Sequence, residues 1–181
     1  MYQGGMSQVI GVIKHKDEMI LLLDFERIMV DINPASSISV EDVKKLGKRE
    51  RSEKKIVIAE DSPLLRKLLF DTMQEAGYMN LDFFENGRDV YEYLEALVKA
   101  DKNIENHVQL VITDVEMPQM DGHHLTKKIK THPDLRKLPV IIFSSLITDD
   151  LRHKGEEVGA EDQISKPEIA ELILRMDQLI L

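Results

Sequence analysis

The sequence contains no cysteine among its 181 residues. This absence excludes a disulfide framework, a thiolate nucleophile and a zinc site built on cysteine ligands. Basic residues are also fewer than acidic ones: 24 lysines and arginines stand against 33 aspartates and glutamates, for a net charge of −9. Such a balance argues against broad nucleic-acid binding through a basic face.

Long apolar runs are missing as well. The longest, Met19 to Leu23, is far too short to span a bilayer. Residues 1–11 lack the basic segment and long apolar stretch of a signal peptide. We therefore expect a cytoplasmic protein without direct membrane insertion. A hydrophobic content of 43% and a charged content of 31% are typical of a folded globular chain.

The N-terminal segment has two short apolar runs, Val9–Ile13 and Met19–Phe25, separated by the polar stretch His15–Glu18. This pattern predicts a β-hairpin. Residues 26–32 are expected to form a third strand or a helical turn, and a loop is expected at Asn33–Ser37. Two strands cannot form a stable unit alone. They must pair with a missing part of their own domain, with another chain or with the rest of this one, and a homodimer through these strands is one hypothesis.

The next segment, Val40–Arg51, is rich in charge of both signs, which favours a solvated linker. Ser39 and Asp42 have the spacing of a short helix cap. The pattern divides the chain into three parts: a β-rich segment at 1–38, a charged linker at 39–53 and an α/β domain at 54–181.

From Lys54 onward, strands and helices alternate. Ile56–Ala59 is a continuous apolar run, as expected of a parallel strand that is covered on both faces. The other strands are predicted at 81–84, 108–113, 140–143 and 162–165. Helix starts are indicated at Ser62-Pro63, Asp121-Gly122, Thr148 and Pro167, a helix end at Gly77, and a turn at Asn86-Gly87. Five βα units predict a five-stranded, doubly wound parallel sheet of the flavodoxin-like class.

Ligands of an open parallel sheet bind at the carboxyl ends of its strands. The polar residues at these ends are Glu60, Asp61, Asp114, Ser144, Ser145 and Lys166. Two carboxylates about 4 Å apart repel each other by roughly 4 kcal/mol at an effective dielectric near 20. A bound Mg²⁺ removes this cost. A carboxylate beside the metal can then attack phosphorus, while Mg²⁺ and Lys166 neutralise the phosphoryl oxygens.

These residues resemble a known family. The matching pieces are Ala59-Glu60-Asp61-Ser62, Asp114-Val115-Glu116-Met117-Pro118 with Asp121-Gly122, Phe143-Ser144-Ser145 and Lys166-Pro167. In this order, they resemble the CheY-like receiver domains of two-component signalling. The resemblance implies that Asp114 is the phosphorylation site and accepts a phosphoryl group from a histidine kinase. It also implies that Ser144 is the switch hydroxyl and Lys166 the lysine that pairs with phosphate.

The same resemblance implies a Mg²⁺ site. Glu60 and Asp61 would form the acidic pair, with Asp61 as the direct ligand beside Asp114, and the backbone carbonyl of Glu116 would complete the protein ligands. Two positions depart from the family pattern. Glu60 is one methylene longer than the usual aspartate, and Gln163 stands where the switch aromatic is expected. An aromatic relay coupled to the switch hydroxyl is therefore not expected here.

The N-terminal segment has its own resemblance. Val9–Ile13, Leu21–Asp24 and Asp31–Pro34 resemble the last third of a CheW-type coupling domain. A coupling domain fused to a receiver is the plan of CheV-type chemotaxis proteins. This resemblance implies a chemotaxis protein that takes its phosphoryl group from a CheA-type kinase and modulates receptor–kinase coupling, with that kinase and chemoreceptors as partners.

The same residues leave other functions to be considered. A generic two-component receiver without a coupling role remains the alternative. A transcriptional regulator ranks low, because no DNA-binding module follows Leu181 and the charge is acidic. Haloacid-dehalogenase-type phosphatases need a second aspartate where this chain has Glu116. We therefore expect a phosphoacceptor with slow Mg²⁺-dependent self-phosphorylation and self-dephosphorylation, not an enzyme. The adjacent His123 and His124 cannot share a helix face and are expected at the surface, not as ligands.

Overall fold

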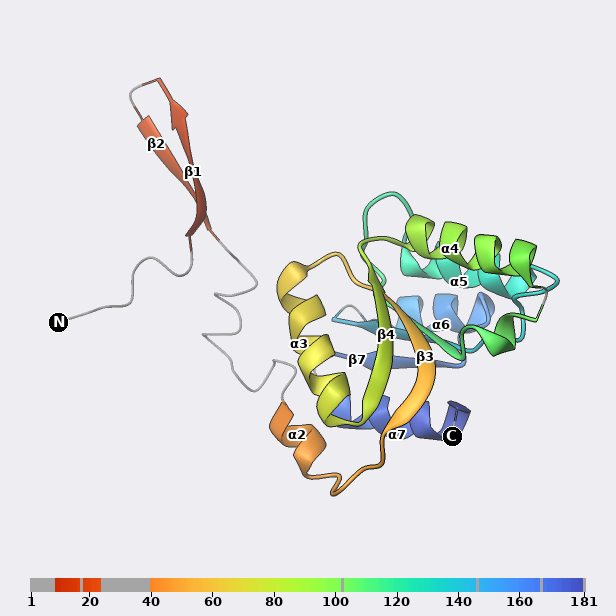
Figure 1. Cartoon of the computed structure of the whole chain (residues 1–181). Coiled ribbons are helices and arrows are strands. Elements are labelled where there is room, and N and C mark those ends of the chain that lie inside the picture. The colour runs from red at the N-terminus through yellow and green to blue at the C-terminus, as the bar shows by residue number, and fades with distance from the viewer. Residues whose placement is uncertain are drawn as a thin grey trace. The chain divides into compact units, whose positions relative to one another are not determined.

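The computed structural model describes residues 9–16, 18–23, 40–101, 103–145, 147–166 and 168–180 (Figure 1). The chain forms two compact units, Met1–Ser37 and Ile38–Leu181. The first contains a hairpin, and the second contains a parallel sheet with its helices. Among the described residues, no helix is long and apolar enough to cross a bilayer.

The predicted hairpin is present. Strands β1 (Val9–His15) and β2 (Glu18–Leu23) pair antiparallel, and Lys16 in the turn between them has a φ of 53°. Every residue of β2 is exposed, including Leu21 at 56%, because no second layer covers the described strands. The predicted element at 26–32 and the resemblance residues Asp24 and Asp31–Pro34 lie outside the described residues.

The second unit contains the predicted five-stranded parallel sheet. Its strand order is β4-β3-β5-β6-β7, and all neighbouring pairs are parallel. The strands are β3 (Ser52–Ala59), β4 (Tyr78–Phe84), β5 (Leu110–Thr113), β6 (Val140–Ser144) and β7 (Asp162–Ser165). Since β3 and β5 are neighbours at the centre, the residues that follow them are brought together at one edge of the sheet.

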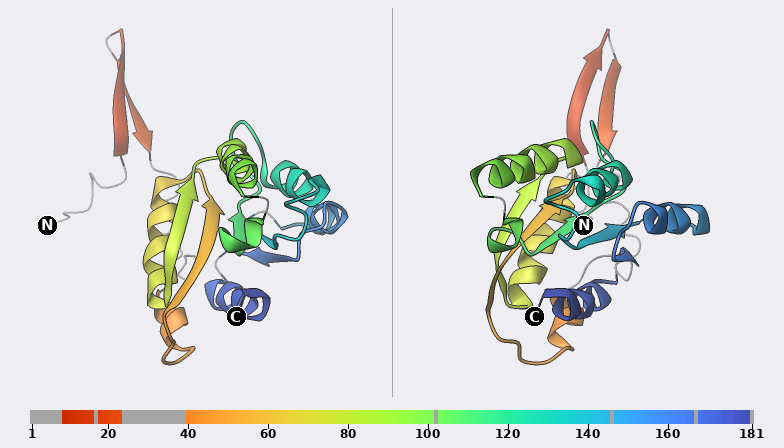
Figure 2. Two further views of the ribbon diagram at one scale, coloured as in Figure 1. Left: turned by 45° about the vertical axis from the view of Figure 1, so that its right-hand side comes forward. Right: turned by 90° about the vertical axis from the view of Figure 1, so that its right-hand side faces the viewer.

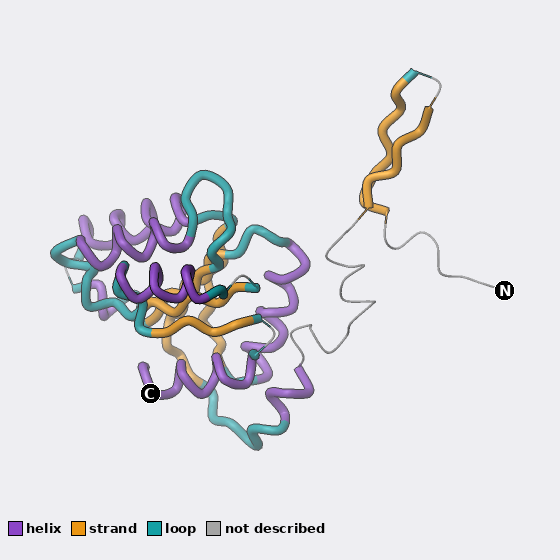
Figure 3. The backbone as a smooth tube through the Cα atoms, turned by 180° about the vertical axis from the view of Figure 1, so that it is seen from behind, coloured by secondary structure: helices purple, strands orange, loops and turns teal. Residues whose placement is uncertain are grey.

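Helices cover both faces of this sheet (Figures 1 and 2). Ile56 and Ile58 of β3 belong to a core that includes helices α3 (Pro63–Glu75) and α7 (Ile169–Ile180). Val57 and Ala59 point to the opposite core, with α4 (Gly87–Ala100) and α5 (Gly122–Thr131). The helix α6 (Asp149–Glu157) contacts α5 and β7. Both faces of the central strand are buried, which explains its uninterrupted apolar sequence. Figure 3 shows the strands enclosed between helices in this unit.

Most helix boundaries follow the sequence signals. The Ser62 side chain accepts a hydrogen bond from Leu65 N and caps α3, with proline at the next position. Gly77 ends that helix at a φ of 91°, where an added Cβ would lie 2.4 Å from the carbonyl oxygen of Glu50. At Asn86-Gly87, where a turn was predicted, the chain bends at Asn86 and leads directly into α4, with Asn86 as its N-cap and Gly87 as its first residue.

The segment predicted to be a solvated linker packs on the second unit over its described part. Helix α2 (Val40–Lys44) buries Val43, and Leu46 lies against the same core as α3 and α7. Leu46 lies in the turn that follows the helix. Arg49 then donates from Nε to the carbonyl oxygen of Ala76 at 2.9 Å and forms an ion pair with Asp177. The amino-acid composition of this segment does not predict these contacts.

Candidate functional site

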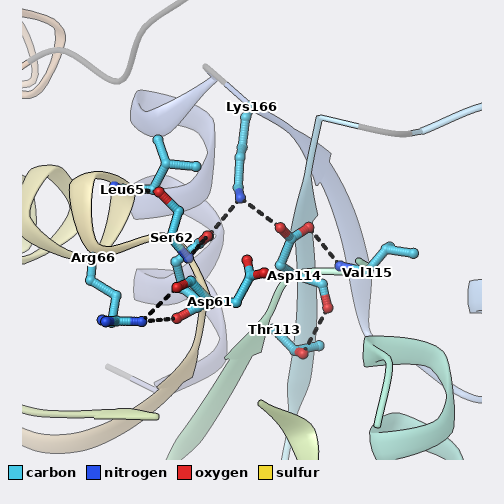
Figure 4. Close-up of polar contacts among 9 residues, drawn as sticks. Asp61, Ser62, Leu65, Arg66, Thr113, Asp114, Val115 and Lys166 are labelled. Atoms are coloured by element: carbon cyan, nitrogen blue, oxygen red, sulfur yellow. Dashed lines mark hydrogen bonds and ion pairs between the residues drawn. The ribbon is translucent and has the colours of Figure 1, made fainter. Parts of the chain in front are cut away.

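Lys166 joins two carboxylates at the carboxyl edge of the sheet. Its Nζ lies 2.6 Å from Glu60 Oε2 and 3.0 Å from Asp114 Oδ2. In Figure 4, the side chains of Lys166, Asp114 and Asp61 point toward one another. The lysine reaches them from the end of β7, across the intervening β6. The structure thus brings together residues from three separate strand ends, as the topology predicted.

The loop after β5 holds Asp114 tightly. Its backbone N donates to the carbonyl oxygen of Ala59 at 3.0 Å, and its Oδ1 accepts from Val115 N at 2.6 Å. The loop then folds back so closely that a Cβ at Gly122 would lie 1.9 Å from the carbonyl oxygen of Asp114. Only glycine fits there, because any side chain would push the loop outward. The Asp114 carboxylate therefore has a defined orientation, with each oxygen accepting a different donor.

Burial and ion pairing act together on the charged groups. Burial raises the pKa of Glu60, and the Lys166 ammonium only partly opposes that shift, while the neighbouring Asp114 adds to it. Burial alone would lower the pKa of Lys166, but its ion pairs with Glu60 and Asp114 outweigh that effect and raise the pKa above its usual value. The site thus holds a buried cation between two carboxylates and keeps it charged.

The carboxylates also form a group that fits a divalent cation. One oxygen each from Glu60, Asp61 and Asp114 lie within 4.8 Å of one another. The Glu60 carboxylate already accepts from Ser62 N and Lys166, whereas the Asp61 carboxylate is exposed and makes no hydrogen bond or ion pair within the described part of the chain. Asp61 and Glu116 both line an open cleft of about 600 Å³. Carboxylate and carbonyl oxygens beside open solvent are suitable ligands for Mg²⁺, which retains several waters.

Ser144 lies at the end of β6 and is buried, in register with Ser165 of β7. Its carbonyl oxygen accepts from Lys166 N at 3.0 Å, so the serine directly adjoins the strand end that carries the lysine. Ser145 is exposed. Gln163 is buried and donates from Nε2 to the carbonyl oxygen of Arg152 at 2.7 Å, so that its amide is bonded to α6.

Sequence reasoning overlooked Arg66, which donates to the carbonyl oxygens of Glu60 and Asp61. Its position one turn into the helix after the acidic pair is the signal that could have revealed it.

The prediction of a surface position for His123 was wrong. Its side chain is only 2% exposed, and its Nε2 lies 3.3 Å from the carbonyl oxygen of Leu151. Contact between α5 and α6 covers this histidine, and a sequence does not reveal which helices meet.

The response regulator receiver domain family matches residues 56–177. The chain belongs to this family. Receiver domains bind Mg²⁺ at an acidic pocket, and in this chain Glu60, Asp61 and Asp114 form an acidic cluster.

Solved structures agree with the fold. A receiver domain of a signal transduction histidine kinase from Syntrophus aciditrophicus is 33% identical, with a TM-score of 0.56 over 68% of this chain and 89% of that one. The chemotaxis response regulator CheY4 of Vibrio cholerae is 28% identical, with a TM-score of 0.55 over 72% of this chain and 100% of that one. The second unit therefore has the CheY-like receiver fold.

Curated relatives include two chemotaxis proteins of Helicobacter pylori. CheV3 is 32% identical over 147 residues, covering 80% of this chain and 45% of the relative. CheV2 is 33% identical over 161 residues, covering 87% of this chain and 48% of the relative. The chain thus spans about half the length of these relatives. Both alignments are longer than the 122 residues of the receiver match (177 − 56 + 1), so the similarity extends beyond it.

Proposed function

We propose that this chain is a chemotaxis signalling protein whose receiver domain accepts a phosphoryl group on Asp114 from a histidine kinase of the CheA type. The observation that carries the proposal is the Asp114 carboxylate bonded to the buried Lys166 at 3.0 Å, beside two further carboxylates. A structural ion pair would need neither the third carboxylate nor the open cleft. The arrangement suits a nucleophile that must receive a dianionic group.

In this proposal, Asp61, Asp114 and the backbone carbonyl of Glu116 hold Mg²⁺, and Glu60 supports the site from its buried position. The metal would neutralise charge on the phosphoryl oxygens. Lys166 orients Asp114 before transfer and pairs with the phosphoryl group afterwards. The Ser144 hydroxyl donates to that group once it is attached.

The transfer step uses one oxygen of Asp114 as the nucleophile. A lone pair on a carboxylate oxygen forms a bond to phosphorus, and the bond between phosphorus and the donor's imidazole nitrogen breaks. The nitrogen keeps that electron pair, and the product is an acyl phosphate on Asp114. Val115 N donates to Oδ1 at 2.6 Å and Lys166 to Oδ2 at 3.0 Å, so both oxygens are oriented beforehand. The residues supply orientation and charge, the main needs of phosphoryl transfer.

We assign the output to receptor–kinase coupling in the cytoplasm, on the basis of the similarity to the CheV proteins. Residues 1–38 would belong to a CheW-like part, 39–53 would join the two parts, and 54–181 would form the receiver domain. The exposed apolar residues of β2 support a partner for the hairpin, and pairing with a second copy is one form that it can take. Light scattering that finds only monomer at high micromolar concentration contradicts that dimer.

Phosphorylation is tested with Mg²⁺ and a small acyl phosphate donor. The wild-type chain should gain one acid-stable, base-labile phosphoryl group by mass spectrometry, and Asp114→Asn should gain none. Asp71→Asn removes an exposed carboxylate from α3 and is the matched control, expected to label as the wild type does. Equal labelling of Asp114→Asn and the wild type refutes the acceptor assignment.

Coupling requires a separate experiment with CheA-type kinase and chemoreceptor preparations. The wild-type chain should be retained by receptor–kinase complexes, and its phosphorylation should change the amount retained. Asp114→Asn should bind without responding to phosphodonor. A chain that is phosphorylated by the kinase but never retained by the complexes is a generic two-component receiver, and that outcome contradicts the coupling role.

A further inference from the structure

Arg66 of α3 forms a bridge to the backbone of the acidic pair. Its Nη1 donates to the carbonyl oxygen of Glu60 at 2.8 Å and to that of Asp61 at 2.9 Å, and Figure 4 shows both contacts. Its Nη2 lies 3.0 Å from Glu85 Oε1. The side chain is 20% exposed, so most of it is withdrawn from solvent. These contacts involve no carboxylate of the acidic cluster, so Arg66 acts on the backbone of the turn.

The two acidic side chains of that turn depend on the backbone to different degrees. Glu60 is buried, and its carboxylate is held by Ser62 N at 3.2 Å and by Lys166 Nζ at 2.6 Å. The exposed Asp61 carboxylate has no such support among the described residues. Its position is therefore determined by its own main chain, and the Asp61 carbonyl is one of the two groups that Arg66 holds. A loose main chain here would let the carboxylate swing away from Asp114.

We propose that Arg66 is a positioning residue of the metal site, which holds the Glu60-Asp61 backbone so that the Asp61 carboxylate faces Asp114. This inference rests on the proposed function, since it needs a divalent cation to bind at that site. A guanidinium suits the task because its donors lie in one rigid plane and its hydrogen bonds are charge-assisted. An ammonium is a point charge and cannot reproduce the same arrangement.

The electrostatic effect of Arg66 opposes its positioning effect. Its positive charge lies close to the cation site and, by Coulomb repulsion, would weaken the binding of a divalent cation. Glu85 pairs with the guanidinium at 3.0 Å and moderates that repulsion. Removing the arginine therefore tightens metal binding if its charge dominates and weakens it if its hydrogen bonds dominate. The sign of the change in affinity separates the two accounts.

The test measures Mn²⁺ affinity by electron paramagnetic resonance, with Mg²⁺ as the competitor. Arg66→Ala should bind about tenfold more weakly than the wild type, the range found when groups that orient metal ligands are removed. Arg66→Lys keeps the charge and should also bind several-fold more weakly. Glu85→Gln keeps both contacts of Arg66 with the carbonyl oxygens. Its Mn²⁺ affinity should stay within about twofold of the wild type, since ion pairs of exposed side chains contribute little. Circular dichroism checks that each variant is folded. If Arg66→Ala does not fold, the affinity of Arg66→Lys decides the test.

A second measurement separates positioning from a general loss of structure. Labelling of Arg66→Ala by a small phosphodonor should be slow at limiting Mg²⁺ and approach the wild-type rate at saturating Mg²⁺. Affinity in Arg66→Ala that equals or exceeds the wild type overturns the role of Arg66. A wild-type chain that binds no cation and takes up no phosphoryl group instead overturns the proposed function, so the two failures are distinguishable.

Discussion

Replacing Lys166 with methionine tests the energetics of the site without using its activity. The side chain is 5% exposed and contacts Glu60 and Asp114, whose side chains are 2% and 12% exposed. Methionine keeps a similar length but removes the ammonium. The variant therefore retains two carboxylates in a poorly solvated place with no positive charge between them.

The size of the effect follows from these distances. At an effective dielectric near 20, one contact at about 3 Å is worth roughly 5–6 kcal/mol before desolvation is subtracted. Breaking a buried ion pair by removing one partner costs about 3–5 kcal/mol, because the remaining charge is uncompensated. We expect a loss of that size in the free energy of unfolding near neutral pH without divalent cations. Such a loss is a large fraction of the roughly 5–15 kcal/mol that stabilises a domain.

The pH dependence identifies the cause. Burial already raises the pKa of Glu60 above its ordinary value of 4.5, and loss of Lys166 removes an influence that lowers it. The folded variant then holds the Glu60 proton more tightly than the unfolded chain does. This contribution to stability is present at low pH and is lost as the pH rises through the folded-state pKa. The destabilisation should therefore be smaller at about pH 5 than at about pH 7.5.

Urea unfolding followed by circular dichroism measures these differences, with chelator or with Mg²⁺ present. Mg²⁺ should reduce the loss, because a cation bound by the carboxylates replaces part of the missing charge. Lys67→Met is the matched control: its partner Asp71 lies at 3.0 Å on the exposed face of α3, and the change should cost about 0–1 kcal/mol. A Lys166→Met loss below about 1 kcal/mol, or one independent of pH, refutes the reasoning.

Two further predictions concern α6 and its neighbours. In Gly155→Ala, the new Cβ would lie 2.2 Å from Gln163 Oε1, so the end of the Gln163 side chain must move and give up its hydrogen bond to the carbonyl oxygen of Arg152. We expect a loss of about 1–3 kcal/mol in urea unfolding, the cost of leaving a buried polar group without its partner. Adding Gln163→Ala removes the clashing atom, and a double variant whose loss is the sum of both single losses contradicts the clash. Burial and the nearby Lys154 lower the pKa of His123 below 6.5, whereas a hydrogen bond to a backbone carbonyl raises that of His153. NMR titration should give a midpoint below 6.5 for His123 and above 6.5 for His153. His123 should make the fold less stable as the pH falls below 6.5, because the unfolded chain then takes up a proton that the folded chain does not.

The sheet and the cluster of candidate residues could be predicted because both depend on local patterns. Ile56–Ala59 is apolar throughout because both of its faces are covered. Ser62-Pro63 indicates the start of the next helix. Once the strands are parallel, the residues that follow them must meet at one edge, which is why Asp114 and Lys166 could be grouped from the sequence. Element boundaries were less predictable. Strand β4 begins at Tyr78, three residues before its predicted start at Leu81, because pairing with β3 extends it.

The charged segment and His123 show why other features could not be predicted. Val43 is one of three apolar residues in a charged stretch, and its burial depends on the contacts of α2 with α3 and α7. His123 is polar and adjacent to another histidine, and its burial depends on contact with α6. In both cases the deciding neighbour is distant in sequence, and composition carries no information about it.

The sequence by itself determined the order of the elements, the edge at which the candidate site lies and the residue types that reach it. Hydrophobic periodicity, helix caps and the chemistry of carboxylates and lysine are properties of short segments, so they can be predicted from the local sequence. Only the tertiary structure decided how those groups are held: Lys166 between two carboxylates, Gly122 against the Asp114 carbonyl, and Arg66 across the acidic turn. Distances of this kind depend on how separate helices and strands pack together, which short-range patterns do not specify.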